Sequence, residues 1–421
     1  MVRAIVIGGG VGGLTAAAAL HQRGWAVTVL ERSPALEPVG AGISLSPNAQ
    51  RALDVIGLGD EIRALAAWQR DGGLRTPGGR WLSRTSSEAV AERFGGSLVL
   101  LHRATLVDVL RSRLPKDAVR TGLAARLADP GGPGRPATVT TDEGDLEAEL
   151  VLGADGINSG VRAALFPGHP GPTYAGFTTW RVVVPAPERH FGSHETWGRG
   201  ELWGSHLMKD GTAYAYAAAG VPAGWQAPGG ERAELIRRFG HWHEPIPTIL
   251  DSARPEQILR HDVYYMRHAL PAYHRGRVAL LGDAAHAMTP SLGQGGNQAI
   301  EDAVVLAHHA DPEREPGPAL AAYSAERLPR TMGIVAKAYR TGRINTTRLS
   351  RPVALLRNAL IAGVDRLGPN LVLRTLDGIV DWQPPQQVQP PRQVQPPRQV
   401  QPPQQVQPPQ QVRPPRQPQQ P

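Results

Sequence analysis

The chain has 421 residues, of which 41% are hydrophobic, and this is enough to bury the core of a globular protein with two domains. Its formal net charge is +8 at pH 7, but residues 383–421 hold four arginines and no acidic residue, so the rest of the chain carries only +4. An excess this small and scattered argues against a phosphate-binding face, and we therefore expect no nucleic-acid partner.

Cysteine is absent from the sequence, and this absence excludes disulfides, thiolate metal sites and a redox-active dithiol. We expect no metal ion, and any electron carrier must be a bound cofactor. The glycines near the N-terminus, with a strand and a helix around them, argue against a secretory signal peptide. Because no run of about 18 apolar residues occurs, we expect no membrane span and a cytoplasmic enzyme.

The first thirty residues predict a βαβ unit. Its parts are a short buried strand at 3–7, an alanine-rich helix at 13–23 and a second strand at 26–30. Further along the chain we expect two helices and a group of strands, at 47–58, 103–114 and 137–154.

The pattern changes between about 174 and 219, where alternating, aromatic-rich runs predict a mostly antiparallel sheet. A predicted buried strand at 277–281 then resembles the strands of the N-terminal βαβ unit. It leads into a glycine-rich loop and a helix from about 296 to 309. Helices are expected over 318–380, with Pro352 as a break or a start. The first domain is therefore predicted to be discontinuous.

The C-terminal residues 383–418 are six tandem hexads of the type Gln-Pro-Pro-Arg/Gln-Gln-Val. Such a composition buries no core, so we expect an extended, disordered tail of polyproline type. Two interpretations stay open, namely a dispensable spacer and a docking tail for a proline-recognition domain.

A glycine-rich loop at Gly8–Gly13 follows the first predicted strand and matches G-x-G-x-x-G. Its glycines allow a tight turn, a close approach of the backbone to a pyrophosphate, and packing of the helix against the strand. The N-terminus of the following helix would stabilise the negative charge of a phosphate group. Glu31, at the end of the next strand, is placed to accept hydrogen bonds from the hydroxyls of an adenosine ribose.

A second glycine-rich loop covers residues 282–297 and also follows a predicted buried strand. Asp283 is suited to bind a polyol chain such as ribityl, and the glycines at 293, 295 and 296 let backbone amides approach a flat ring system. A helix N-terminus here would favour the negative charge that a reduced flavin carries. The loop therefore favours FAD over NAD as the resident cofactor. For His286 we favour a structural role over a catalytic one.

Three motifs together carry a resemblance to a known family: the first glycine loop with Glu31-Arg32, the segment 153–162 with Asp155-Gly156, and the loop that starts at Gly282-Asp283. On these motifs the sequence resembles the class A flavoprotein monooxygenases, which share the para-hydroxybenzoate hydroxylase fold. It looks closest to the salicylate-hydroxylase-like and urate-hydroxylase-like members, and the resemblance covers most of residues 1–345.

The resemblance implies that FAD is held across both loops, with NADH or NADPH as a transient co-substrate and O2 as the oxidant. It implies that Arg103 reaches the FAD, that Asp155-Gly156 is linked to FAD and NAD(P)H binding, and that Pro290 lies beside the flavin ring. Reduced flavin would react with O2 to give a C4a-hydroperoxide, which transfers an oxygen atom to an electron-rich ring. The predicted cofactor-binding residues are Gly8, Gly10, Val11, Gly12, Gly13, Glu31, Arg32, Gly42, Arg103, Asp155, Asp283, Gly293, Gly295, Gly296 and Asn297.

Substrate-binding residues are expected from the antiparallel sheet. Arg181 is suited to hold a carboxylate or phenolate, and His206 to assist deprotonation of a phenol. Alternation along a strand turns only about half of such residues inward, so a packing or surface role is an equal alternative for each. The predicted catalytic residues are Arg181, His206 and Tyr216, and the predicted pocket residues are Trp203, Tyr214 and Pro290.

The predicted fold is α/β, with a discontinuous Rossmann-like FAD-binding domain and a mostly antiparallel substrate domain. We predict the FAD-binding domain at 1–75, 98–173 and 270–345, the substrate domain at 76–97 and 174–269, C-terminal helices at 346–382, and the tail at 383–421. The predicted oligomeric state is a monomer or a homodimer.

The predicted activity is hydroxylation of a small aromatic compound. One alternative is an epoxidase, or a hydroxylase of a larger polycyclic or polyketide substrate. Another is a flavin reductase or dehydrogenase that does not activate oxygen, although the sequence contains neither a second strand-bound glycine fingerprint nor a cysteine pair. A third is a flavin-bearing scaffold whose tail recruits a partner.

Overall fold

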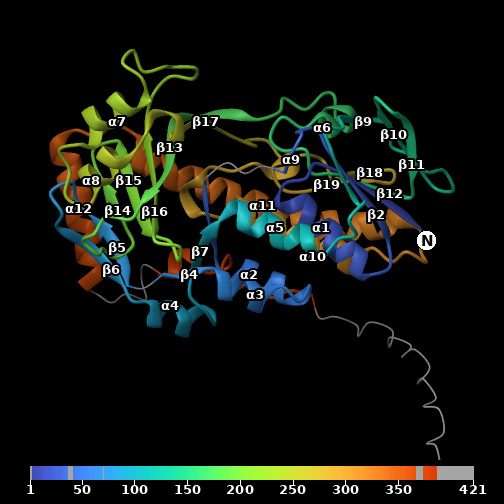
Figure 1. Cartoon of the computed structure of the whole chain (residues 1–421), viewed down its shortest axis with the longest axis horizontal. Helices are drawn as coiled ribbons and strands as arrows, with labels where there is room; N and C mark the ends of the chain where they lie inside the picture. The colour runs from blue at the N-terminus through green and yellow to red at the C-terminus, as the bar shows by residue number, and fades with distance from the viewer. Residues whose placement is uncertain (1, 37–40, 70, 367–372, 386–421) are drawn as a thin grey trace, which may run out of the picture. The chain divides into compact units, whose positions relative to one another are not determined.

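The computed structural model describes residues 2–36, 41–69, 71–366 and 373–385 of the chain (Figure 1). Residues up to Gln386 cluster into one compact unit. Nearly all of the hexad-repeat tail lies outside the described residues, so both interpretations of it stay predictions. In the described ranges, no helix is both long enough and apolar enough to cross a membrane.

A six-stranded sheet carries both glycine-rich loops, in the strand order β18-β19-β12-β1-β2-β8. The strands are β1 (Arg3–Ile7), β2 (Ala26–Glu31), β8 (Val119–Thr121), β12 (Leu150–Gly153), β18 (His274–Arg275) and β19 (Val278–Leu280). β1 pairs in parallel with β2 and β12, and β12 pairs in parallel with β19. Parallel strands covered on both faces are apolar along their length, which explains the buried runs in β1 and β12.

Three helices gather beside this sheet. The first, α1 (Val11–Gln22), packs against α10 (Gly295–His309) and α5 (Arg103–Ser112) (Figure 1). Residues 16–19 of α1 are all alanine and all buried, and such small side chains let helices approach closely. The helices predicted at 13–23 and 103–114 are thereby confirmed, as are the strands predicted at 3–7 and 26–30.

A seven-stranded sheet lies in the part of the chain where the antiparallel sheet was expected, in the order β17-β13-β16-β15-β14-β5-β6. The strands are β5 (Gly72–Arg75), β6 (Trp81–Thr85), β13 (Thr173–Pro185), β14 (His194–Trp197), β15 (Glu201–Leu207), β16 (Thr212–Ala219) and β17 (Leu259–Tyr265). Every neighbouring pair is antiparallel except β14 with β5. The mostly antiparallel sheet is thereby confirmed.

The two faces of this sheet are covered by different elements. One face packs on α7 (Glu231–Phe239) and α8 (Ile246–Ser252) in a core that includes Trp180 and Trp203. The other face packs partly on α11 (Pro316–Thr346), in a buried cluster that includes Leu202 and Val335. The two faces therefore carry alternate residues of each strand.

β5 joins this sheet although the predicted boundary at residue 75 places it with the FAD-binding part. Its sequence, Gly-Gly-Leu-Arg, lacks the alternation that predicts a half-buried strand, so the pattern did not show it. The division of the chain into two domains stays a prediction, because residues up to Gln386 form one unit.

The remaining elements connect the two large sheets or cover their edges. A small antiparallel sheet has the order β3-β7-β4, and another has the order β11-β10-β9. These strands are β3 (Gly42–Leu45), β4 (Ala67–Trp68), β7 (Val99–His102), β9 (Ala125–Asp129), β10 (Ala137–Thr141) and β11 (Gly144–Ala148). The other helices are α2 (Pro47–Val55), α3 (Gly59–Leu65), α4 (Ser87–Phe94), α6 (Gly160–Leu165), α9 (Asp283–His286), α12 (Arg351–Arg366), η1 (Pro255–Gln257), η2 (Pro290–Leu292) and η3 (Arg374–Leu376).

Arg51 of α2 holds the described C-terminal segment, residues 373–385, against the rest of the unit. Its guanidinium donates to the carbonyl oxygens of Trp382 at 2.9 Å and Phe94 at 2.8 Å, and also to that of Val380. The planar fork of arginine is suited to bind several carbonyls at once, and a lysine in its place would not reproduce this arrangement.

Replacing this guanidinium tests the attachment. Arg51→Met leaves carbonyl groups without donors, and we expect it to lower the free energy of unfolding by about 2–4 kcal/mol, measured by urea titration. Arg189→Met, at an exposed position, is the matched control and should change stability little. Equal stability of the two variants would show that the segment contributes nothing through Arg51.

Candidate active site

The first glycine loop leaves no room for side chains at two of its positions. Gly8 has a φ of +112°, and a Cβ atom there would lie 2.3 Å from the carbonyl oxygen of Ala154. A Cβ atom on Gly13 would lie 2.0 Å from the carbonyl oxygen of Gly8. Both positions therefore require glycine, and the backbone of the loop is left bare at the start of α1.

The start of α1 is a site suited to an anion. The helix begins at Val11 after Gly10, and among the described residues no side chain caps this end. Free backbone amides and the helix dipole favour negative charge at such an end. Glu31 braces the loop, since its carboxylate accepts from the backbone N–H groups of Gly9 at 2.7 Å and Ser33 at 2.9 Å. Its predicted contact with a ribose stays a prediction.

The second glycine loop begins at Gly282, which has a φ of +58° and leads into α9. The carboxylate of Asp302 in α10 accepts from the backbone N–H of Gly282 at 2.9 Å. Nε2 of His286 lies 2.5 Å from the same carboxylate oxygen. His286 is 1% exposed, and this placement agrees with the structural role that we favoured for it.

A buried ionic cluster lies behind this loop and consists of Glu301, Asp302 and Arg327, each 0% exposed. Arg327 donates to Asp302 at 2.7 Å and to Glu301 at 2.6 Å. Burial by itself raises the pKa of Asp302, but His286 and Arg327 outweigh it and hold that pKa well below its usual range. Charges buried this deeply are stable only when each has its partners.

The segment after β12 lies next to the second glycine loop. Asp155 accepts from the backbone N–H of Val161 at 3.0 Å through Oδ2, while its buried Oδ1 has no hydrogen-bond partner among the described residues. Arg162 ties this segment to the second loop, because it donates to the carbonyls of Ile157 at 2.8 Å and Ala284 at 3.0 Å. Arg162 lies within the motif at 153–162, but the sequence did not indicate this role.

Asp283 and Arg103 lie where the two loops approach each other. Part of Asp283 is exposed to solvent, yet desolvation of its carboxyl by the surrounding protein raises the pKa of that group, against the opposing effects of His286 and Arg103. Arg103 is the first residue of α5, and its Nη2 lies 3.8 Å from where a Cβ atom on Gly10 would be. Three features fit a long cofactor such as FAD. They are the glycine loop without side chains, the buried acceptor on Asp155, and the carboxyl of Asp283, which solvent reaches although protein surrounds much of it.

A row of residues crosses four strands of the seven-stranded sheet. Backbone pairing places Arg181 beside Tyr216, Tyr216 beside Gly204, and Gly204 beside Glu195. The ring of Tyr216 lies over Gly204, since a Cβ atom there would be 2.3 Å from Cζ of the tyrosine. The Tyr216 hydroxyl therefore reaches Glu195 and donates to its carboxylate at 2.5 Å, while Trp197 donates to the other oxygen at 2.8 Å.

The neighbouring row brings Tyr214 beside His206. The His206 ring stacks on that of Tyr216 with centroids 5.6 Å apart and planes inclined by 17°. Burial lowers the pKa of His206 to about 4 and raises the pKa of Tyr214 to about 12, the latter against the effect of Arg181. Burial and the adjacent Glu195 also raise the pKa of Tyr216. At neutral pH all three side chains are therefore uncharged.

The rings of His206, Tyr214 and Tyr216 form an aromatic face on the sheet, and the strand β3 lies between this aromatic face and the second glycine loop. A Cβ atom on Gly42 would lie 2.7 Å from the ring of Tyr214. A Cβ atom on Gly296 would lie 2.9 Å from Cδ1 of Ile43. The Asn297 side chain donates to the carbonyl of Ser44 at 3.0 Å and accepts from the N–H of Ser46 at 2.8 Å. The structure therefore brings Tyr214, Gly42 and the glycine loop together.

Trp203 is a correction to the predicted pocket. It lies on the opposite face of the sheet, 1% exposed, with its ring centroid 5.4 Å from that of Phe239 and its N–H donating to Ser205. The reason is alternation, because Trp203 is one residue out of phase with Gly204, which lies beneath the Tyr216 ring.

The other predicted residues are placed as follows. Arg181 lies with Nη2 3.1 Å from Nδ1 of His261, and Pro290 is exposed at the start of η2. Arg32 is exposed and Val11 is buried. Asn297 is fully buried and its side chain binds protein backbone, so a cofactor contact of this residue stays a prediction. Glu195 was missed, because its strand, His-Glu-Thr-Trp, carries no motif.

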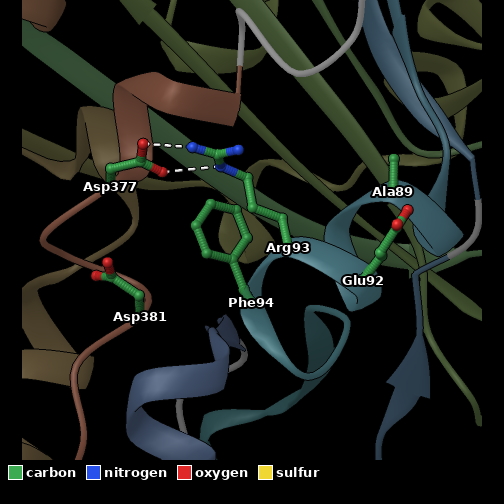
Figure 2. Close-up of a pocket in the computed structure, with 6 residues that line it drawn as sticks. All are labelled: Ala89, Glu92, Arg93, Phe94, Asp377 and Asp381. Carbon is green, nitrogen blue, oxygen red and sulfur yellow. Dashed lines mark hydrogen bonds and ion pairs between the residues drawn. The ribbon is translucent and has the colours of Figure 1, made fainter.

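Two hollows lie near these elements. One has a volume of about 210 Å³ and reaches Glu195 and His206. Its other lining residues are Gln69, Gly72, Gly73, Thr85, Ser86, Ser87, Val90, Ser97, Leu98, Ser193 and His194. The second, of about 500 Å³, lies between α4 and the C-terminal segment, where Arg93 binds Asp377 (Figure 2). The lining of this larger hollow includes no residue of either glycine loop, so we do not assign the chemistry to it.

Comparison with known proteins places the chain among flavoproteins. A family model described as FAD binding domain matches residues 1–338. The chain is 37% identical over 342 residues to the aurachin C monooxygenase/isomerase of Stigmatella aurantiaca, covering 81% of this chain and 88% of that protein. It is 38% identical over 353 residues to the 3-amino-4-hydroxybenzoate 2-monooxygenase of Streptomyces cremeus, covering 80% and 86%.

Among solved structures, Klebsiella pneumoniae HpxO complexed with FAD and uric acid matches with a TM-score of 0.81 at 28% identity. The match covers 90% of this chain and 97% of that one. The predicted α/β fold and the predicted resemblance are thereby confirmed.

The buried cluster generates a prediction on stability and cofactor retention. Arg327→Met removes the cation that two buried carboxylates share, leaving Asp302 with His286 and Glu301 with Arg330, and we expect it to lower the free energy of unfolding by about 3–5 kcal/mol. Because Asp302 also holds Gly282, the purified variant should contain less flavin, measured by visible absorbance. Arg340→Met, at an exposed position of the same helix, should keep both properties. Loss of stability with unchanged flavin content would show that the cluster does not shape the loop.

Two histidines with lowered pKa values generate a prediction on pH. Burial lowers the pKa of His206 and of His194 to about 4, whereas a histidine in the unfolded chain titrates near about 6.5. Between these values the unfolded chain binds more protons, so stability should rise from pH 4 to 6.5, by up to about 3 kcal/mol for each histidine, and level off above. Urea titrations across this range should show a smaller rise for His206→Gln. The control, His268→Gln at an exposed position, should keep the full rise, and an unchanged slope in His206→Gln would contradict the prediction.

Proposed function

The chain belongs to the FAD binding domain family and is an FAD-dependent monooxygenase of the aromatic-hydroxylase type, and we propose that it hydroxylates a small aromatic acid or phenol held against the face that carries Arg181, Tyr214 and Tyr216. NADH or NADPH serves as the co-substrate and O2 as the oxidant. The observation that carries the proposal is the position of β3, which has the glycine loop on one side and Tyr214 on the other.

The cofactor would be held by residues of both loops. The start of α1 would hold its pyrophosphate, Glu31 its adenosine ribose, and Asp283 its polyol chain. Arg103, between the loops, would add a positive charge. The bound flavin supplies the redox chemistry with O2 that no side chain of a cysteine-free protein provides. The chain's own residues bind, orient and exclude water.

The substrate would be oriented by a charged and a neutral group. The Arg181 guanidinium, which is partly exposed, would pair with a carboxylate or phenolate. The neutral His206 imidazole would accept a hydrogen bond from a phenolic hydroxyl and so increase the electron density of the ring. Glu195 would act as a positioning residue, because it fixes the direction of the Tyr216 hydroxyl.

A second candidate is a larger substrate with fused rings or a long substituent, which would be hydroxylated or epoxidised. The observation that favours it is the hollow of about 210 Å³, which continues from Glu195 and His206 toward α4.

Other properties stay predictions from the sequence. These are the cytoplasmic location, the monomeric or homodimeric state and the partner of the proline-rich tail. Activity of a chain that ends at residue 385 would separate catalysis from any role of the tail.

The test is turnover by the purified, FAD-loaded protein with NADH and with NADPH, across aromatic acids, phenols and fused-ring compounds. We expect some compounds to stimulate oxidation of the nicotinamide and to gain one oxygen atom from isotopically labelled O2, detected by mass spectrometry. Arg181→Met should raise the KM for acids by about tenfold or more, with little effect on uncharged phenols.

The outcome also separates the alternatives. Preferential turnover of fused-ring compounds would support the second candidate. Rapid oxidation of the nicotinamide without an oxygenated product from any compound would identify a reductase and contradict both candidates.

A further inference from the structure

The helix α12 carries an apolar stripe that faces solvent. Val353, Leu356, Leu360 and Val364 follow one another at intervals of three or four residues and therefore share one side of the helix. They are 48%, 61%, 62% and 40% exposed, and Leu355, at 60%, widens the stripe. Scattered exposed apolar residues are normal, but a contiguous group of this kind marks an interaction site.

The opposite side of α12 is the one that attaches to the unit. Ala354 is buried, Arg357 donates to the carbonyl of Gly198 at 2.8 Å, and Asp365 accepts from the backbone N–H of Arg84 at 3.2 Å. α12 packs beside β6 at the edge of the seven-stranded sheet (Figure 1). The helix is therefore anchored by one side, and the stripe points away from the described part of the chain.

The charges around the stripe indicate which surface would cover it. Arg348 is exposed just before the helix, Arg351 at its start and Arg366 at its end. The single carboxylate of α12, on Asp365, is on the attached side. In the described ranges the stripe is thus flanked by positive charge at both ends, with no acidic side chain of the same helix to balance it.

A second copy of the chain fits this distribution poorly. In a two-fold contact between stripes with the helices antiparallel, Arg351 would lie beside Arg366 of the other copy. Neither end of α12 offers an exposed carboxylate to pair with them. A lipid surface that carries negative headgroups accepts both ends at once, because arginines attract anionic headgroups while apolar side chains enter the acyl boundary.

We propose that α12 lies flat on an anionic membrane surface and binds the enzyme to it peripherally. The five apolar side chains enter the boundary between headgroups and acyl chains, and Arg348, Arg351 and Arg366 bind phosphate groups. The sequence of residues 383–421, with four arginines and no acidic residue, adds positive charge to the same chain. This inference does not depend on which substrate the enzyme oxidises.

The experiment is vesicle flotation of the full-length, FAD-loaded protein. One set of vesicles contains equal parts of phosphatidylglycerol and phosphatidylcholine, and the other contains phosphatidylcholine alone. We expect binding to the anionic vesicles that weakens as salt is raised, and much weaker binding to the neutral ones. Leu356→Glu/Leu360→Glu should lower the partition coefficient by at least about tenfold.

The matched control places the same change at other exposed apolar residues. Leu65→Glu/Ile236→Glu adds the same charge at positions that are 42% and 36% exposed, and it should bind vesicles like the parent protein. A chain that ends at residue 385 measures the contribution of the tail. The truncated chain should bind vesicles more weakly than the full-length protein. Within the truncated chain, Leu356→Glu/Leu360→Glu should still lower binding further. Melting temperatures establish that every variant is folded.

Three results would overturn the proposal. The first is a parent protein that ignores anionic vesicles. The second is equal loss of binding in both double variants, or loss only on removal of the tail. The third is a parent dimer, seen by light scattering, that Leu356→Glu/Leu360→Glu dissociates while vesicle binding is unchanged, because the stripe would then be an interface between copies.

Discussion

The candidate active site depends on charges buried behind the second glycine loop. Glu301, Asp302 and Arg327 are fully buried, and such groups are tolerated only because each is paired. Asp302 uses its second oxygen to hold the N–H of Gly282 and to contact His286. The path of the loop at its start is therefore set by electrostatics in the interior, and the glycines leave its backbone accessible on the other side.

The helix α10 transmits this constraint to both sides of the site. Its residue Asn297 binds the backbone at the end of β3, at Ser44 and Ser46, and β3 in turn lies against Tyr214 through Gly42. Its residue Glu301 also binds Arg330, which donates to the carbonyl of Ile379 in the C-terminal segment. One helix thus positions the cofactor loop, the strand beside the aromatic face and the end of the described chain.

The sequence predicted the glycine loops well because their signals are local. The requirement at Gly13 arises from Gly8 in the same loop, and the requirement at Gly8 arises from its positive φ and from Ala154 after β12, but the G-x-G-x-x-G spacing that indicates both is local. The ionic cluster was not predictable, since Glu301 and Arg327 are 26 residues apart and either one alone predicts an exposed helix residue. The antiparallel sheet was predictable, but its inward face was not, because aromatic residues occur in both phases and Trp203 belongs to the opposite face.

The aromatic face shows why a search for reactive side chains finds only part of a site. Gly204 has no chemistry of its own, but its missing side chain is what lets the Tyr216 ring lie across β15 and reach Glu195. Burial, and after it the contact with Glu195, raises the pKa of Tyr216, and the same contact fixes its hydroxyl as a donor to the carboxylate, so the residue orients its surroundings and does not supply a phenolate. The acid–base character of this face therefore follows from the position of a glycine in the strand register, and only the three-dimensional pairing reveals it.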